Sequence, residues 1–153
     1  MVRRERSGMS ITKLSPEILL LDTHVWIWLM NADPHLKRSK WLPIIEKAVE
    51  KNRVTVSVIS VWEVAMLEAK NRIVLPYSLY EWVHRALGDA GIALASLTPE
   101  IAIESTRFPE TSGFDPADRI LMATAKSLGA LLLTRDEKIL SYGKKHNLQS
   151  AAV

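Results

Sequence analysis

The chain has 153 residues, of which 48% are hydrophobic and 24% are charged, a composition typical of one globular domain and not of a disordered chain. No apolar run reaches the ~18 residues of a membrane-spanning helix, and the basic N-terminus lacks the apolar segment of a signal peptide. The absence of cysteine excludes disulfides and thiolate metal sites, and a net charge of +3 does not by itself identify a partner. We therefore expect a cytoplasmic protein that does not enter a membrane.

Short apolar runs alternate with helical patterns along most of the chain. Residues 1–17 are predicted to form a polar N-terminal arm, and residues 18–153 a single domain, because no repeat or Pro/Gly-rich linker divides them. Four apolar runs bounded by polar or turn residues predict strands, at 18–21, 54–58, 92–97 and 130–133. Because these runs lack polar alternation, we expect strands that are buried on both faces of a parallel sheet.

Five of the six predicted helices begin near a residue that favours a helix N-terminus. These residues are Thr23, Ser60, Ser78, Thr98 and Asp115. The predicted helices are 25–30, 61–71, 79–90, 100–107, 116–129 and 137–145. The alternation of strands and helices predicts an α/β fold, a three-layer α/β/α sandwich with a mainly parallel central sheet and right-handed crossovers.

Acidic residues fall where predicted strands end and helices begin. Asp22 ends the first strand, and Asp136 follows the fourth in LLLTRD. Asp115 and Asp118 open a helix in FDPADR, and Glu63 lies in the first turn after the second strand. In a parallel α/β sheet, ligand chemistry gathers at the carboxyl ends of the strands. We therefore expect all these acids at one rim of the sheet.

Each acid also has a purely structural interpretation. Glu63 follows Ser60 with the S-x-x-E spacing of a capping box. Asp115 is a suitable N-cap before Pro116, and the negative charge of Asp136 can interact favourably with the dipole of the last helix.

Asp22 is the hardest of these acids to explain by structure alone, because Thr23 can cap the next helix without it. Several carboxylates at one rim would repel one another by several kcal/mol at low effective dielectric unless a cation intervened. Asp22 is therefore best interpreted as a metal ligand. A carboxylate site suits Mg²⁺ or Mn²⁺, whereas zinc is improbable because cysteine is absent and no histidine pair has ligand spacing.

Four motifs in order resemble the PIN-domain family, and within it the VapC-type toxin ribonucleases of bacterial toxin–antitoxin pairs. The motifs are LLLDTH at 19–24, SVWEVAM at 60–66, DPADRILMATA at 115–125 and LLLTRD at 131–136. None is specific alone, so their order and spacing carry the resemblance, which extends from residue 19 to about residue 148.

The resemblance implies a Mg²⁺- or Mn²⁺-dependent endoribonuclease that cuts RNA, pairs with a cognate antitoxin protein and forms a homodimer. The acidic quartet of the family maps here to Asp22, Glu63, Asp118 and Asp136. Asp22, Asp118 and Asp136 would hold the metal, whereas Glu63 would either bind a second ion or orient the attacking water. Asp115 would be an accessory acid, and Thr134 would orient an acid or its water.

Basic residues near the rim are candidates for contacts with flanking phosphates, although each can equally be a solvated surface charge. They are Lys70, Arg72, Arg119 and Arg135.

The main alternative is a non-catalytic Mg²⁺-binding α/β module for regulation or protein binding. A receiver-like domain would carry an aspartate at the end of its third strand, where this chain has Thr98. A DxD-type phosphatase would need a second aspartate at His24. Both therefore fit the sequence less well than a nuclease does.

Overall fold

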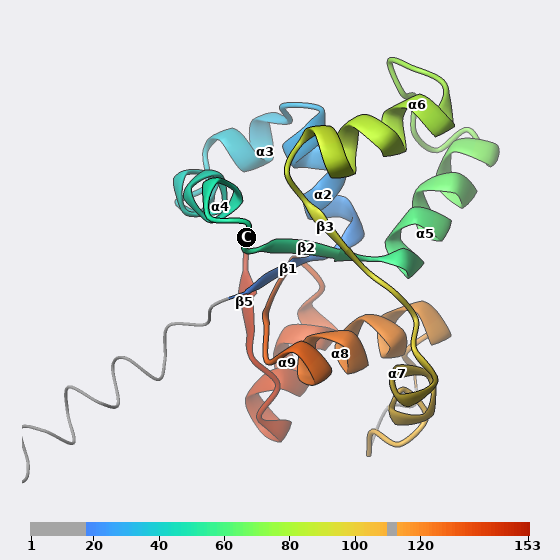
Figure 1. Cartoon of the computed structure of the whole chain (residues 1–153). Helices are drawn as coiled ribbons and strands as arrows, with labels where there is room; N and C mark the ends of the chain where they lie inside the picture. Colours follow the sequence, from blue (N-terminus) through green and yellow to red (C-terminus); the bar gives the residue numbers. More distant parts are fainter. Residues whose placement is uncertain (1–17, 110–112) are drawn as a thin grey trace, which may run out of the picture.

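The central element of the fold is a parallel sheet of five strands in the order β3-β2-β1-β4-β5 (Figure 1). The computed structural model describes residues 18–109 and 113–153, so the predicted arm 1–17 lies outside the described residues. The strands are β1 (Leu19–Leu21), β2 (Val54–Ser57), β3 (Ala93–Ala95), β4 (Leu131–Thr134) and β5 (Ser150–Ala152). Every adjacent pair is parallel, which confirms the predicted α/β class.

Helices cover both faces of this sheet, as predicted for a three-layer sandwich (Figure 1). One layer contains α2 (Thr23–Met30), α3 (Pro34–Lys37), α4 (Trp41–Glu50), α5 (Val58–Ala69), α6 (Leu79–His84) and the π-helical turn η1 (Arg85–Asp89). The other layer contains α7 (Pro99–Glu104), α8 (Pro116–Leu128) and α9 (Glu137–His146). Among the described helices, none is both long and apolar enough to cross a membrane.

The first strand separates two hydrophobic cores. Leu19 and Leu21 point into the core that contains Trp26, whereas Leu20 points into the core that contains Met122 and Ile139. Successive side chains of a strand point to opposite faces, so a strand between two helical layers must be apolar at every position. This requirement explains the continuous apolar run that leads to Asp22.

Trp26 and Trp62 have different surroundings. Trp26 is fully buried, donates its indole N–H to the carbonyl oxygen of Ala86 at 2.9 Å, and packs edge-on against Trp82. Trp62 is 53% exposed. It lies on the outer surface of α5, beside the acidic residues described below.

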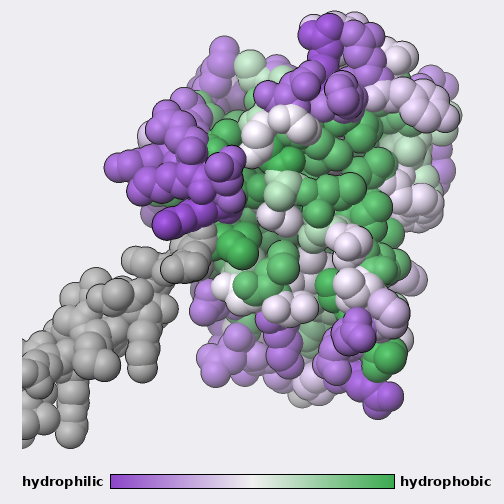
Figure 2. Space-filling view, in the orientation of Figure 1, coloured by the Kyte–Doolittle hydropathy of each residue, from purple (hydrophilic) through white to green (hydrophobic). Residues whose placement is uncertain are grey.

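The predicted strand at 92–97 differs from the structure in length and in burial. The strand β3 pairs only with β2 and therefore forms an edge of the sheet. Its residues are mostly exposed, and Leu94 keeps 48% of its surface accessible. The prediction of burial on both faces is thus wrong here. Figure 2 shows apolar surface over the region where β3 and α5 lie in Figure 1.

The fifth strand was not predicted. Asn147, with a φ of 59°, ends α9 in the left-handed conformation and turns the chain back towards the sheet. A Cβ atom added to Gly143 would lie 2.7 Å from the carbonyl oxygen of Leu148, so the absence of a side chain in α9 permits this close return. The strand β5 then pairs with β4, with Ser150 opposite Leu132.

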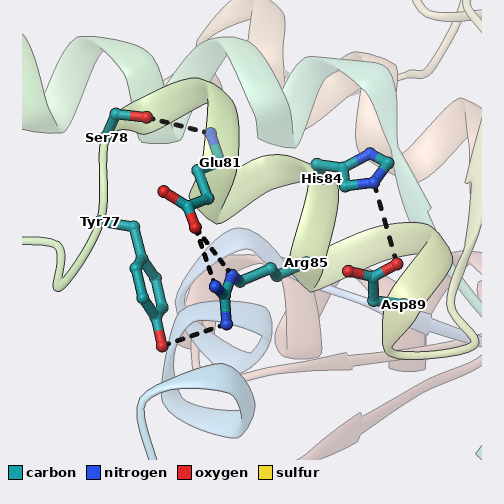
Figure 3. Close-up of polar contacts among 6 residues, drawn as sticks. All are labelled: Tyr77, Ser78, Glu81, His84, Arg85 and Asp89. Atoms are coloured by element: carbon teal, nitrogen blue, oxygen red, sulfur yellow. Dashed lines mark hydrogen bonds and ion pairs between the residues drawn. The ribbon is translucent and has the colours of Figure 1, made fainter.

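Figure 3 shows a polar network along α6 and the residues on either side of it. Ser78 caps the helix by accepting a hydrogen bond from the backbone N–H of Glu81. The guanidinium of Arg85 donates to Glu81 at 2.8 Å and to the hydroxyl of Tyr77 at 3.3 Å, and it also lies over the Tyr77 ring. Such exposed pairs typically contribute under ~1 kcal/mol each to the free energy of unfolding. We assign this network a minor structural role.

Candidate functional site

Two acids lie at the point where the strand order reverses. The strands β1 and β4 are adjacent and parallel, with Leu21 opposite Leu133. Asp22 follows β1 directly, and its backbone N–H donates to the carbonyl oxygen of Leu133 at 3.0 Å. Asp136 lies two residues beyond the end of β4. This position beside a topological switch is where open α/β sheets bind their ligands.

The hydroxyl of Thr134 connects these two acids. Thr134 is fully buried, and its Oγ1 donates to Oδ2 of Asp22 at 2.5 Å. The same oxygen accepts a hydrogen bond from the backbone N–H of Asp136 at 3.0 Å. The structure therefore places Thr134 where an orienting residue is needed, while its contribution to catalysis stays a prediction.

The acids also form the caps of three helices. Asp22 accepts a hydrogen bond from the backbone N–H of Thr23 at 2.7 Å and is the N-cap of α2, so the prediction that Thr23 is the cap is wrong. Asp136 caps α9. Asp115 caps α8 by accepting from the backbone N–H of Asp118 at 2.8 Å, as predicted. Negative charge at a helix N-terminus is stabilised by the helix dipole, which partly offsets the repulsion between the acids.

The predicted capping box between Ser60 and Glu63 is wrong. The helix α5 begins three residues earlier than expected, at Val58, and Ser57 is its cap. Oε1 of Glu63 instead accepts a hydrogen bond from Oγ1 of Thr23 at 2.7 Å, and Thr23 also hydrogen-bonds Oγ of Ser60 at 2.9 Å. Thr23 and Ser60 are buried, so this network ties α5 to α2 and fixes one oxygen of Glu63.

All the predicted acids line one hollow of about 480 Å³, which we call the acid pocket. Its lining residues are Asp22, His24, Trp28, Glu63, Asp115, Asp118, Arg135 and Asp136. They come from four segments of the chain, as expected from the ends of parallel strands. The convergence of the acids is therefore a feature of the structure, and their catalytic and metal-binding roles stay predictions.

A larger apolar groove of about 670 Å³ adjoins the acid pocket and shares His24, Glu63 and Asp115 with it. The groove lies along α5, where Trp62 and Met66 contribute apolar surface. Two of the basic residues predicted near the rim, Lys70 and Arg72, line this groove and not the acid pocket. Arg135 lines the acid pocket, and Arg119 is half-buried with its Nε enclosed by the protein.

Three carboxyl groups in the acid pocket, those of Asp22, Glu63 and Asp118, have raised pKa values. Burial raises the pKa of Asp22 above its ordinary value, against hydrogen bonds from Thr134 and the backbone of Thr23 that lower it. Burial likewise raises the pKa of Glu63, against its hydrogen bond from Thr23. For Asp118, burial and then the negative charges of its acidic neighbours raise the pKa to about 7. A cation in the pocket would reverse this effect by favouring the charged forms.

The donor set of the pocket fits a hard divalent cation bound partly through water. Carboxylate oxygens are the ligands of Mg²⁺ and Mn²⁺, and Mg²⁺ usually keeps several waters while one or two carboxylates bind it. Among residues 18–109 and 113–153, no group of three His, Asp or Glu side chains is spaced to hold an ion directly. The five carboxyl groups around the pocket are oxygen donors of the kind that these ions prefer.

The sequence reasoning missed Trp28 and Ser60 as members of the site. Trp28 follows His24 by four residues, which places both on one face of α2 and was a detectable signal. Ser60 had no such signal, because its contact depends on how closely α5 approaches α2.

Comparisons with known proteins agree with this architecture. The PIN domain family model matches residues 19–145, most of the chain. The chain belongs to the PIN-domain family. It is 32% identical over 124 residues to Ribonuclease VapC22 of Mycobacterium tuberculosis, covering 81% of this chain and 91% of that protein.

Solved structures show the same PIN fold at low sequence identity. One is VapBC2 from Rickettsia felis bound to a DNA fragment from their promoter, with a TM-score of 0.64 and 14% identity over 88% of this chain and 98% of that chain. A toxin-antitoxin complex from Klebsiella pneumoniae aligns with a TM-score of 0.54 and 23% identity, over 78% of this chain and 88% of that one.

The raised pKa of Asp118 predicts how the stability of the metal-free PIN domain depends on pH. Its folded pKa of about 7 lies above the ordinary 3.8, so ionisation favours the unfolded state. In EDTA, the free energy of unfolding should fall as pH rises from about 4 to about 7. Asp118→Asn should remove part of this fall and stabilise the protein at pH 7 by roughly 1–2 kcal/mol, a value discounted because the carboxyl is partly exposed.

Urea unfolding of both proteins across this pH range measures the effect. The matched control is Asp33→Asn, which changes the N-cap of α3 outside the acid pocket. The pKa of Asp33 is lowered by its hydrogen bond from the backbone of His35, so this variant should not gain stability at pH 7. Equal slopes in wild type and Asp118→Asn would contradict the electrostatic account.

Proposed function

We propose that this PIN domain is a metal-dependent endoribonuclease that hydrolyses RNA phosphodiester bonds, and that it is the toxin of a toxin–antitoxin pair. The observation that carries the proposal is the acid pocket, where five carboxylates meet at the switch point of the sheet. The relative from M. tuberculosis is named a ribonuclease, which supports the same chemistry. The protein would act in the cytoplasm, where both RNA and a protein antitoxin are present.

Three acids at the ends of β1 and β4 and in the first turn of α8 would hold Mg²⁺ or Mn²⁺, directly or through water. They are Asp22, Asp118 and Asp136. When bound, the ion lowers the pKa of a water molecule and neutralises charge on the phosphate. Thr134 keeps the Asp22 carboxylate in one orientation through their short hydrogen bond. Glu63, whose Oε1 is fixed by Thr23, would orient the attacking water or bind a second ion, with Asp115 as an accessory acid at the rim.

The proposed partners are an RNA substrate, a cognate antitoxin and a second copy of the chain. The structural neighbours include VapBC and toxin-antitoxin complexes, which motivates the antitoxin. The exposed apolar surface around β3 and the groove along α5 offer area for protein contacts. Buried apolar area is the main source of affinity in most protein–protein association.

We predict RNA cleavage by the purified protein with Mg²⁺ or Mn²⁺ and none in EDTA. Asp118→Asn preserves the shape of the side chain but removes its charge, so it should lower the cleavage rate by two or more orders of magnitude, about 3 kcal/mol of transition-state stabilisation. The assay follows cleavage of a labelled single-stranded RNA. Asp89→Asn serves as the control, since that acid is exposed on η1 and lies outside the acid pocket.

Two results would contradict the proposal in different ways. Cleavage that persists in EDTA would refute the metal mechanism, and full activity of Asp118→Asn would refute the assignment of that residue. A non-catalytic Mg²⁺-binding module predicts metal binding with no cleavage of any RNA tested.

We also predict that expression of the wild-type protein arrests bacterial growth and that coexpression of its cognate antitoxin relieves the arrest. Asp118→Asn should be harmless at equal protein levels, because the arrest depends on RNA cleavage. Growth curves with immunoblots of protein level test this. Unimpaired growth with verified wild-type protein and no antitoxin would count against the toxin role.

A further inference from the structure

One cationic side chain lies on the wall of the acid pocket itself. Arg135 stands between Thr134 and Asp136 in the chain and lines the same hollow as the five acids. Lys70 and Arg72 line the neighbouring groove instead. Arg135 is therefore placed differently from the other basic residues that the sequence suggested.

The guanidinium of Arg135 is held by an aromatic ring and not by a carboxylate. Its Cζ lies 5.4 Å from the ring centroid of Trp28, within the range of a cation–π contact. The Trp28 ring is in turn stacked with the ring of His35, with centroids 5.3 Å apart and an interplanar angle of 20°. Oδ1 of Asp33 lies 2.7 Å from Nδ1 of His35, so the stack is anchored at its far end.

This arrangement is unexpected for an arginine beside several acids. An exposed guanidinium next to carboxylates usually forms a bidentate ion pair with one of them. Within the described residues, three ion pairs are found, and Arg135 takes part in none of them. Its side chain is exposed and lines the acid pocket.

We infer that Arg135, held against the Trp28 ring at the wall of the acid pocket, binds a phosphate of the RNA substrate, and that Trp28 is its positioning residue. This inference rests on the proposed ribonuclease function. In this account, Arg135 and Trp28 together attract the negatively charged RNA into a pocket whose other charged residues are acids.

The chemistry of the guanidinium supports a phosphate as its ligand. Its planar fork of N–H donors matches two phosphate oxygens and keeps its charge at any physiological pH. An arginine paired with Asp136 or Asp22 would offer no net charge and fewer free donors to RNA. The Trp28 ring contacts the flat face of the guanidinium and holds Arg135 away from these acids. The N–H groups at the edge of the guanidinium therefore remain available to a ligand.

The experiment measures binding and cleavage of a single-stranded RNA by wild type and Arg135→Gln. Binding is followed by fluorescence anisotropy with Ca²⁺ in place of Mn²⁺, after verifying that no cleavage occurs. Arg135→Gln should weaken affinity about tenfold, as expected for one charge-assisted contact. The slope of log affinity against log salt concentration should become less steep by about 0.7, the loss of one phosphate contact on a single strand. With Mn²⁺, KM should rise while kcat changes little.

Two further variants separate a phosphate contact from general effects. Arg53→Gln removes the same charge at the amino end of β2, opposite the carboxyl ends of the strands where the acids lie, and should leave both the affinity and the salt slope unchanged. Trp28→Leu keeps apolar bulk but removes the π face, and should weaken RNA binding about threefold. In the Arg135→Gln background, Trp28→Leu should have little further effect, because Trp28 acts through Arg135. Thermal melts confirm that each variant is folded.

The outcomes distinguish this inference from the proposed function. If wild type cleaves RNA and Arg135→Gln binds it with unchanged affinity and salt slope, the phosphate-binding role of Arg135 is refuted. Additive effects of the two substitutions would refute the positioning role of Trp28. If wild type itself does not cleave RNA with Mn²⁺, the proposed function fails, whereas the binding data still decide the role of Arg135.

Discussion

The hydrogen bond between Thr134 and Asp22 joins the ends of two adjacent parallel strands, and the acid pocket depends on it. The register of β1 on β4, with Leu21 opposite Leu133, brings the two residues together. A slip by one residue would exchange the two faces of the strand and place Leu20 in the wrong core. Core packing therefore sets the position of the first carboxylate.

The acids combine a structural role with an electrostatic cost. Asp22, Asp115 and Asp136 each cap a helix, so the N-termini of α2, α8 and α9 face the same pocket. Their dipoles favour negative charge nearby. Burial and mutual repulsion act in the opposite direction and raise the pKa of Asp118 to about 7. Helix capping explains why the pocket is tolerated in the folded protein, whereas burial and, after it, the charges of the neighbouring acids raise the pKa of Asp118, which caps no helix. A divalent cation and the guanidinium of Arg135 would supply the missing positive charge.

The sequence was sufficient for those parts of the fold that depend on hydropathy. It predicted β1, β2 and β4, because buried parallel strands are apolar throughout, and it predicted the meeting of the acids from the geometry of parallel strands. The edge strands were harder, because β3 and β5 are defined by their pairing partners more than by their own composition. The cap of α2 was misassigned by one residue, since aspartate and threonine are both good N-caps. The bond between Thr23 and Glu63 depends on the approach of two helices, which no local pattern encodes.

The central claim is that the acid pocket binds a divalent cation through its carboxylates. Titration calorimetry of Mn²⁺ into the purified protein, without RNA, tests it most directly, because no catalytic step or substrate contact contributes to the heat. The account predicts saturable binding by wild type, a loss of affinity of about tenfold or more in Asp22→Asn, and unchanged binding in Asp33→Asn. Equal Mn²⁺ affinity in wild type and Asp22→Asn, or no saturable binding by the folded wild-type protein, would contradict it.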